Sequence, residues 1–313
     1  MHLEARRYTL YGLSIRSVVT LPAARADESA APVEVNVVWQ SDREWDTAGW
    51  KITQPPSSPS HAGVFHAADG RVLLGWGDQL RFVISPARDL ITIVSPPEML
   101  VYAGTVLVGF GFGYLLQLRG VLCLHASVLA REGHAFALLG PSGAGKSTLA
   151  AALVHRGAAL VSDDLLVLKR DSDAFYAQPG CAGMRVDPEA IRELFGMEAD
   201  AFEPVPHLKK RLWNLLDRSD QPAGRCVSRA VPIEAIYLLK GQAHGRPEIE
   251  PALSGASSLR ELLGAWYPPG YLQSLTQPRL EELQALASAH PLCVIRQVKQ
   301  WTELPGLVDL LLT

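Results

Sequence analysis

A glycine-rich segment at residues 140–147 has the residue types and the spacing that bind nucleotide phosphates. It reads GPSGAGKS and satisfies the pattern G-x-x-x-x-G-K-[ST]. The stretch HAFALLG before it is typical of a buried strand, and STLAAALVHRG after it is typical of a helix. Backbone N–H groups of such a loop point at phosphate oxygens, and the helix N-terminus adds a favourable dipole. The sequence therefore predicts a phosphate-binding loop (P-loop) between a strand and a helix.

Two side chains of the loop are expected to act beyond its backbone. Lys146 would reach the terminal phosphates, and Ser147 would bind Mg²⁺. The alternative is a glycine turn that binds nothing, which the flanking strand and helix disfavour. The residues predicted to bind the nucleotide are Gly140, Pro141, Ser142, Gly143, Ala144, Gly145, Lys146, Ser147 and Thr148.

Two adjacent carboxylates, Asp163 and Asp164, follow the next apolar run, AALV. Phosphoryl transfer to an alcohol needs a carboxylate for the metal and a group that takes the proton. Because adjacent strand residues point to opposite sides, only a local bend brings both carboxylates to one phosphate. We therefore expect one to hold Mg²⁺ and the other to serve the nucleophile. The alternative is a solvated turn or a helix cap.

Further candidates are a histidine and several cations. His125 precedes a strand predicted to face the nucleotide and could orient phosphate or acceptor, although a core histidine satisfied by its neighbours fits the pattern almost as well. Arg185 could stabilise charge in a phosphoryl transition state. Lys209, Lys210 and Arg211 could do the same, or HLKKRLWNL could be a solvated helix face.

The elements that must position these residues differ along the chain. Residues 1–96 contain short β segments separated by Pro, Ser, Gly and Asp clusters, which predict a small antiparallel domain. The proline-rich segment 53–63 predicts a surface loop. Residues 97–313 begin with a long apolar helix and continue as strand, glycine loop, helix and strand, the start of an α/β unit. We predict an α/β fold with an N-terminal β-rich domain at 1–96 and a P-loop domain at 97–313.

Composition and charge exclude several classes of protein. The chain has 313 residues, 48% of them hydrophobic, which excludes wholesale disorder. Its 29 basic and 32 acidic residues give a net charge of -3, so neither nucleic acid nor anionic lipid is an expected partner. Four scattered cysteines and the lack of a signal peptide favour a cytoplasmic protein. Met99–Leu118 is uncharged and long enough to span a bilayer, but its glycines favour a buried helix.

The stretch HASVLAREGHAFALLGPSGAGKSTLAAALVHRGAALVSDDLLVL resembles the catalytic core of HPr kinase/phosphorylase and its HprK-like relatives. The similarity includes His125, the glycine loop, a helix ending in H-R-G and a strand ending in paired aspartates, and it extends over residues 120–240. It implies a P-loop HprK-like kinase core. In that family the aspartates serve Mg²⁺ binding and proton transfer, and we carry the proton acceptor onto Asp163 and the Mg²⁺ ligand onto Asp164.

The resemblance implies an ATP- and Mg²⁺-dependent kinase that phosphorylates a serine hydroxyl. The N-terminal region looks like the companion domain of smaller HprK-like proteins found with modified-peptide biosynthesis, including lasso-peptide kinases, which implies a ribosomally made peptide as acceptor. One alternative is a regulatory kinase of an HPr-type carrier protein. Another is a nucleotide-sensing module with slow or absent hydrolysis. The choice between ATP and GTP stays open, as does self-association, which the hexameric HPr kinases suggest.

Overall fold

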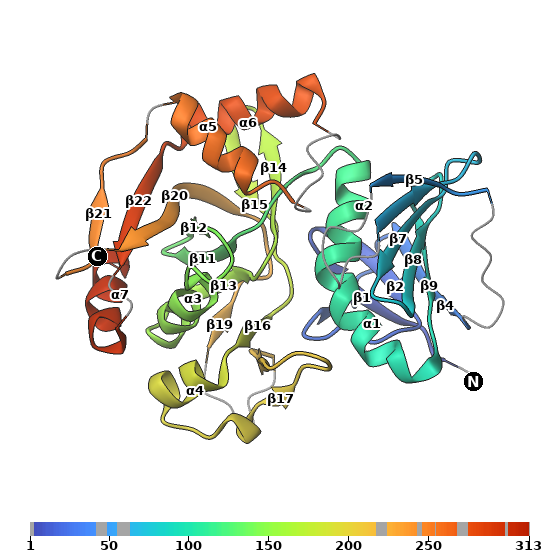
Figure 1. Ribbon diagram of the computed structural model, residues 1–313, viewed down its shortest axis with the longest axis horizontal. Coiled ribbons are helices and arrows are strands. Elements are labelled where there is room, and N and C mark those ends of the chain that lie inside the picture. The colour runs from blue at the N-terminus through green and yellow to red at the C-terminus, as the bar shows by residue number, and fades with distance from the viewer. Residues whose placement is uncertain are drawn as a thin grey trace. The chain divides into compact units, whose positions relative to one another are not determined.

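The computed structural model describes residues 3–41, 49–54, 63–216, 224–242, 246–253, 255–267, 275–297 and 300–312. Most of the predicted surface loop at 53–63 lies outside them. The chain is a mixed α/β protein with several sheets, and it divides into two compact units, Met1–Arg119 and Gly120–Thr313 (Figure 1).

The first unit contains a sheet of nine strands in the described residues, in the order β3-β1-β2-β4-β9-β8-β7-β6-β5. Its neighbours pair antiparallel except for β4, which runs parallel to both β2 and β9. The sheet is therefore mixed, where the sequence predicts an antiparallel one. The strands are β1 (Arg6–Leu10), β2 (Leu13–Ser17), β3 (Arg25–Ala26), β4 (Val35–Gln40), β5 (Lys51–Gln54), β6 (Gly63–His66), β7 (Val72–Trp76), β8 (Leu80–Ile84) and β9 (Leu90–Val94).

The long apolar segment is helical, as predicted, and packs within this first unit. It comprises a 3₁₀ turn η2 (Pro97–Met99), α1 (Leu100–Val106), a π-helical stretch η3 (Leu107–Gly111) and α2 (Phe112–Leu118). The Tyr11 hydroxyl donates a hydrogen bond to the Val108 carbonyl oxygen, and the Trp76 indole donates to the Tyr102 hydroxyl. A Cβ at Gly104 would meet the Thr20 carbonyl oxygen, so a glycine lets the helix approach this backbone.

The boundary between the units consequently follows Arg119 instead of residue 96. The contacts of the helix with Tyr11, Thr20 and Trp76 join segments that are distant in sequence, so composition does not reveal them. In the described part of the chain, Pro97–Leu118 is the one helix long and apolar enough to cross a membrane. An 18-residue stretch of it has a mean hydropathy of 1.8, and 61% of that stretch is buried inside the protein.

The second unit is built on a large sheet with the path β10-β14-β15-β20-β12-β11-β13-β19, and β22 pairs with both β20 and β21. The central strand β12 is buried from its second residue to its last, as expected for a strand covered on both faces. The strands are β10 (Leu122–Leu124), β11 (Ser127–Arg131), β12 (His134–Leu139), β13 (Ala159–Ser162), β14 (Leu166–Asp171), β15 (Ala174–Ala177), β19 (Arg225–Cys226), β20 (Val231–Gln242), β21 (Glu248–Glu250) and β22 (Leu292–Gln297).

The position of β11 decides where the functional candidates meet. It lies between β12 and β13 and is antiparallel to both, so β12 and β13 run parallel to each other. Ser127 at the start of β11 pairs with Leu138, and Val128 pairs with Ser162. The carboxyl ends of β12 and β13 and the amino end of β11 therefore lie at one edge of the sheet.

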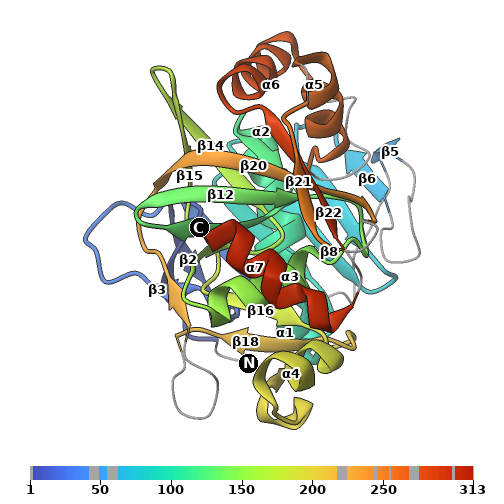
Figure 2. The same cartoon turned by 90° about the vertical axis from the view of Figure 1, so that its left-hand side faces the viewer.

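Helices cover this sheet. Figure 2 shows the C-terminal helix α7 lying along α3, and the two helices are in contact. Leu149, Leu153, Leu307 and Val308 bury their side chains in one core between these helices and the sheet. The helices of this unit are α3 (Lys146–His155), α4 (Pro188–Phe195), α5 (Gly255–Gly264), α6 (Gln277–Ala289) and α7 (Leu304–Leu312), with short 3₁₀ turns η4 (Ala199–Ala201) and η6 (Trp301–Glu303).

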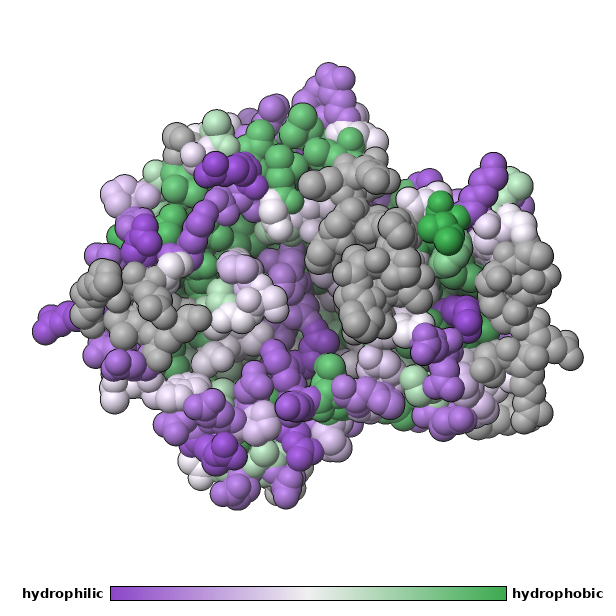
Figure 3. Space-filling view, viewed as in Figure 1, coloured by the Kyte–Doolittle hydropathy of each residue, from purple (hydrophilic) through white to green (hydrophobic). Residues whose placement is uncertain are grey.

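A small sheet carries the remaining cationic candidates. Its order is β16-β18-β17, formed by β16 (Gly183–Val186), β17 (Glu203–Pro204) and β18 (Arg211–Asn214). The segment HLKKRLWNL is therefore a loop followed by a strand, and the helical alternative is wrong. Its Trp213 is fully buried while Arg211, Leu212 and Asn214 are half-buried, because the strand packs one face against the core. Hydrophilic residues cover the surface over α4 and β17 (Figure 3).

Candidate functional site

The glycine loop, residues 140–147, connects the end of β12 to the start of α3, as the sequence predicts. Gly145 immediately precedes the helix with a φ of 94°, and Gly140 has a φ of 149°. A Cβ on Gly140 would come within 2.8 Å of the Leu239 carbonyl oxygen. Both positions therefore require glycine, which explains the first and last glycines of the pattern. The resulting turn directs the N-terminus of α3 at the space inside the loop.

Lys146 is buried, with only 7% of its surface exposed, and its side chain folds back over the loop. Its ammonium nitrogen Nζ donates hydrogen bonds to the carbonyl oxygens of Gly140 (2.7 Å) and Pro141 (3.2 Å). Burial lowers the pKa of this lysine, the charge of Asp163 opposes that shift, and the charge of Lys210 adds to it. The cation is thus held at the loop within the field of a carboxylate.

Asp163 and Asp164 follow β13, and the chain bends there. Asp164 has a φ of 68°, in the left-handed region that non-glycine residues rarely adopt. Two adjacent carboxylates that serve one phosphate at the end of a strand require such a bend. It separates the two side chains: Asp163 Oδ1 accepts a hydrogen bond from the Ser127 hydroxyl at 2.9 Å, and Asp163 Oδ2 accepts from the Arg185 backbone N–H at 3.3 Å.

Arg185 lies on β16 and its guanidinium forms an ion pair with Asp164. The Arg185 side chain is 32% exposed and that of Asp164 is 24% exposed. The pair is therefore accessible to a ligand. Since Arg185 contacts Asp163 through its backbone and Asp164 through its side chain, it links both carboxylates to the small sheet.

His125 precedes β11 and is largely buried. Its backbone N–H donates to the Ala265 carbonyl oxygen, and its ring nitrogen Nδ1 lies 3.0 Å from the Asp164 carbonyl oxygen. The ring stacks on Tyr267 with centroids 6.1 Å apart. Burial, followed by the charge of Lys146, lowers the pKa of His125 to about 4, while Asp163 acts in the opposite direction. The imidazole is therefore neutral at neutral pH and lies against the backbone bend at Asp164.

The cations at 209–211 have different places. Lys210 lies 3.9 Å from Asp187, and its charge lowers the pKa of both Lys146 and His125, so it belongs to the neighbourhood of the loop. Arg211 forms an ion pair with Asp200 at 3.1 Å, and Lys209 is exposed. Neither Lys209 nor Arg211 has a contact with the loop or the aspartates among the described interactions.

The oxygen donors at this edge fit Mg²⁺ together with phosphate. Mg²⁺ usually binds one or two carboxylates, substrate phosphates and water. The Ser147 hydroxyl and the Asp164 carboxylate supply donors of this kind. In the described residues, no group of three or more His, Cys, Asp or Glu side chains could hold a metal ion alone.

Ser127 and Tyr267 lie at this site, but the sequence does not single them out as site residues. Ser127 stands two positions after His125, the spacing that puts two residues on one side of an extended segment, so the tripeptide HAS contains a usable signal. Tyr267 is far from the other residues in sequence, and burial raises its pKa to about 12. Nothing local in the sequence indicates that its ring meets His125.

Comparisons with known proteins add little to this geometry. No family model matches the chain, and no curated protein matches its sequence. Among the solved structures that match is the Hpr(Ser) kinase/phosphatase from Coxiella burnetii, with 22% identity and a TM-score of 0.24. The match covers 37% of this chain and 63% of that chain, so less than two thirds of that protein is spanned. A TM-score this low gives no basis for inferring the function of this chain.

Proposed function

We propose that this protein is a cytoplasmic Mg²⁺-dependent kinase that transfers the γ-phosphoryl group of ATP to a serine hydroxyl. The observation that carries the proposal is the meeting of three groups at one sheet edge: the glycine loop with Lys146, the carboxylates Asp163 and Asp164, and the guanidinium of Arg185. A protein that only binds nucleotide does not require the carboxylate pair.

In the proposed reaction the serine oxygen attacks the γ-phosphorus, and its proton passes to the Asp163 carboxylate. The new O–P bond forms as the bond from phosphorus to the β,γ-bridging oxygen breaks, and ADP leaves with that electron pair. Lys146 and Arg185 would stabilise the charge on the transferring group. Asp164 and Ser147 would hold Mg²⁺, which neutralises charge on the β- and γ-phosphate oxygens.

The orientation of Asp163 supports its assignment as the proton acceptor. Ser127 and the Arg185 backbone donate to different oxygens of this carboxylate, which holds the carboxylate in one orientation. Asp164 reaches the same edge only because its backbone adopts the left-handed conformation. Arg185 would exchange its ion pair with Asp164 for the phosphate when nucleotide and metal bind.

We propose a ribosomally synthesised peptide, of the lasso-precursor kind, or a small protein as the acceptor. The proposal rests on the resemblance of residues 120–240 to HprK-like kinases and of the N-terminal unit to those found with peptide tailoring.

The test is transfer of labelled phosphate from γ-labelled ATP, with Mg²⁺, to small proteins and peptides encoded beside this gene. The expected result is a mass gain of one or more phosphate groups on an acceptor serine, absent when every serine of that acceptor is replaced by alanine. Tight ATP binding without label transfer to any acceptor would contradict the kinase and favour a nucleotide sensor.

A further inference from the structure

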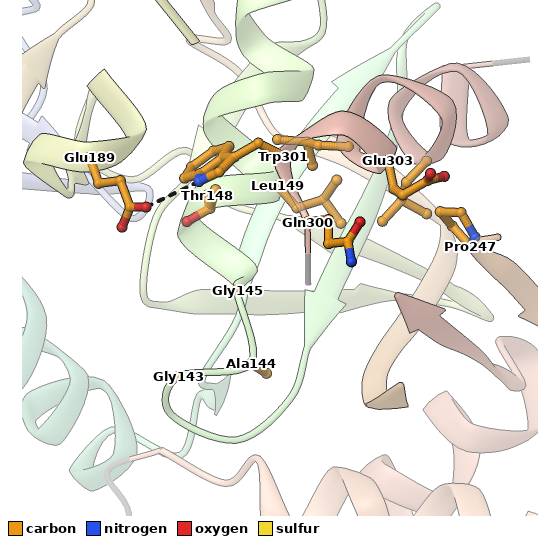
Figure 4. Close-up of a pocket in the computed structure, with 12 residues that line it drawn as sticks. Gly143, Ala144, Gly145, Thr148, Leu149, Glu189, Pro247, Gln300, Trp301 and Glu303 are labelled. Carbon is orange, nitrogen blue, oxygen red and sulfur yellow. Dashed lines mark hydrogen bonds between the residues drawn. The ribbon is translucent and has the colours of Figure 1, made fainter. Parts of the chain in front are cut away.

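A cavity of about 270 Å³ lies against the glycine loop. Its walls come from Gly143, Ala144 and Gly145 of the loop, from Thr148 and Leu149 of α3, and from the C-terminal segment that carries Gln300, Trp301 and Glu303 (Figure 4). Pockets for whole small molecules are typically about 300–1,000 Å³. The cavity is therefore suited to one part of a ligand whose remainder lies elsewhere.

The first turn of α3 separates this cavity from the aspartates. Lys146 extends to the loop carbonyl oxygens, and the charge of Asp163 acts to raise its pKa. Thr148, in contrast, lines the cavity. Residues two apart on an α-helix point about 200° apart, so these side chains leave opposite sides of the turn. A triphosphate in the loop with its terminal phosphate at Lys146 would have its other end at the cavity.

Charge distinguishes the two ends. Lys146, Arg185 and Lys210 gather at the aspartate end, while the cavity is lined by two carboxylates, Glu189 and Glu303. Carboxylates repel phosphate, but they accept hydrogen bonds from sugar hydroxyls and from the amino groups of bases. The cavity therefore suits an uncharged group.

The apolar part of the cavity has a flat aromatic wall. The indole of Trp301 is held by a hydrogen bond from its Nε1 to Glu189 Oε1 at 3.2 Å (Figure 4). The buried side chains of Leu149 and Leu307 also line the cavity. An indole fixed on the wall of a partly apolar cavity is a stacking surface for a nucleobase.

We propose that this cavity binds the nucleoside end of the nucleotide, with a purine packed against Trp301 and its polar edge or its sugar facing Gln300 and Glu303. This inference rests on the proposed function, because it requires a triphosphate in the glycine loop. The inference assigns the nucleoside to this cavity, in addition to the phosphates assigned to the glycine loop.

The experiment measures the dissociation constants of the full-length chain for Mg²⁺·ATP and for Mg²⁺·tripolyphosphate, which lacks the nucleoside. Trp301→Ala is expected to weaken ATP binding about 10- to 100-fold and to leave tripolyphosphate binding unchanged. Trp301→Phe retains a ring and should give a smaller loss. Leu310→Ala, on the exposed face of α7, is the matched control and should bind both ligands normally.

Two outcomes overturn the inference: equal ATP affinity in Trp301→Ala and the parent chain, or a parallel loss of both ligands, which would mean that Trp301 only supports the loop. Gln300→Ala removes an exposed side chain and covers the case in which Trp301→Ala does not fold. It should weaken ATP alone by about 2- to 10-fold. Lys146→Ala tests the proposed function separately, since it should lose both ligands. Normal binding of both by that variant would refute the phosphate site whatever Trp301 does.

Discussion

Each unit of the molecule has a cluster in which an arginine meets an aspartate, and the two clusters differ in what surrounds them. In the first unit Asp27 accepts hydrogen bonds from the hydroxyls of Ser14 and Ser29 and forms an ion pair with Arg7. The Asp27 side chain is only 4% exposed. In the second unit Asp164 pairs with Arg185 and both remain accessible, beside a loop that carries Lys146.

The comparison shows that the residue types alone do not make a site. Asp27 has its oxygens engaged by its own sheet and its neighbouring loop, so the cluster stabilises the fold. Asp163 and Asp164 stand at an edge where a strand end, a glycine loop and a bent backbone leave room for a ligand. The following changes test this contrast.

The largest effect is expected from Lys146→Ala. This lysine places its charge in the loop and adds little to the apolar core, so phosphoryl transfer should fall by about 10³-fold or more while the thermal transition stays intact. Transfer rates and unfolding curves measure both. Lys169→Ala, which removes an exposed lysine of the same unit, is the control and should be fully active. Full turnover of the Lys146 variant would show that the loop is wrongly assigned.

Asp163→Asn should keep nucleotide affinity and lower transfer by about 10²- to 10⁴-fold, the range for losing a general base. Asp164→Asn should also raise the Mg²⁺ concentration needed for half-maximal transfer. Metal titrations of the transfer rate separate the two variants. Exchanged phenotypes would exchange the two roles, whereas normal transfer by the double variant would exclude this mechanism.

Asp27→Asn tests the other cluster. Hydrogen bonds from Ser29 and Ser14 hold the pKa of Asp27 well below its usual range, and losing the charge should reduce the free energy of unfolding by about 1–3 kcal/mol. Nucleotide affinity should not change. Asp69→Asn, in an exposed pair with Arg71, is the matched control and should leave the unfolding transition nearly unchanged. The contrast fails if Asp27→Asn weakens nucleotide binding and leaves stability unchanged.

The smallest effect concerns His125 and pH. Burial lowers its pKa in the folded chain to about 4, from an ordinary value of 6.5. Between these values the unfolded chain binds more protons, so the contribution of His125 to stability is complete above pH 6.5 and is lost as the pH falls towards 4. His125→Gln cannot titrate, and its Tm should decline less over this interval, by a few degrees. Parallel Tm curves for the two proteins would contradict the buried neutral imidazole.

The sequence predicts those parts of the fold that depend on neighbouring residues. The strand at 134–139, the glycine loop and the helix at 146–155 are contiguous, and apolar pattern and glycine spacing suffice to place them. The insertion of β11 between β12 and β13 is not readable in this way, because strand order depends on pairings between distant segments. The same reason explains why composition does not show that the helix at 97–118 packs within the first compact unit.

Some residues of the candidate site can be predicted from the sequence and others cannot, again because local patterns do not show contacts between distant segments. Asp163 and Asp164 are found because two adjacent carboxylates follow an apolar run, and the need for a bend follows from strand geometry. The helical alternative for the segment at 207–215 fails because residues 211–214 pair with β16 and β17, and pairing with other segments is not readable from a local pattern. Trp301 comes from the far end of the chain, and no local pattern connects a single tryptophan to a loop that precedes it by more than a hundred residues.

The left-handed backbone at Asp164 affects which residues evolution retains at this position. A non-glycine residue there costs about 1 kcal/mol or more, and glycine or asparagine adopts the conformation more readily. Selection for stability alone would therefore replace the aspartate. Under the proposed function, homologous chains without phosphoryl transfer should drift to glycine or asparagine at this site and gain stability, whereas chains with it should retain the carboxylate.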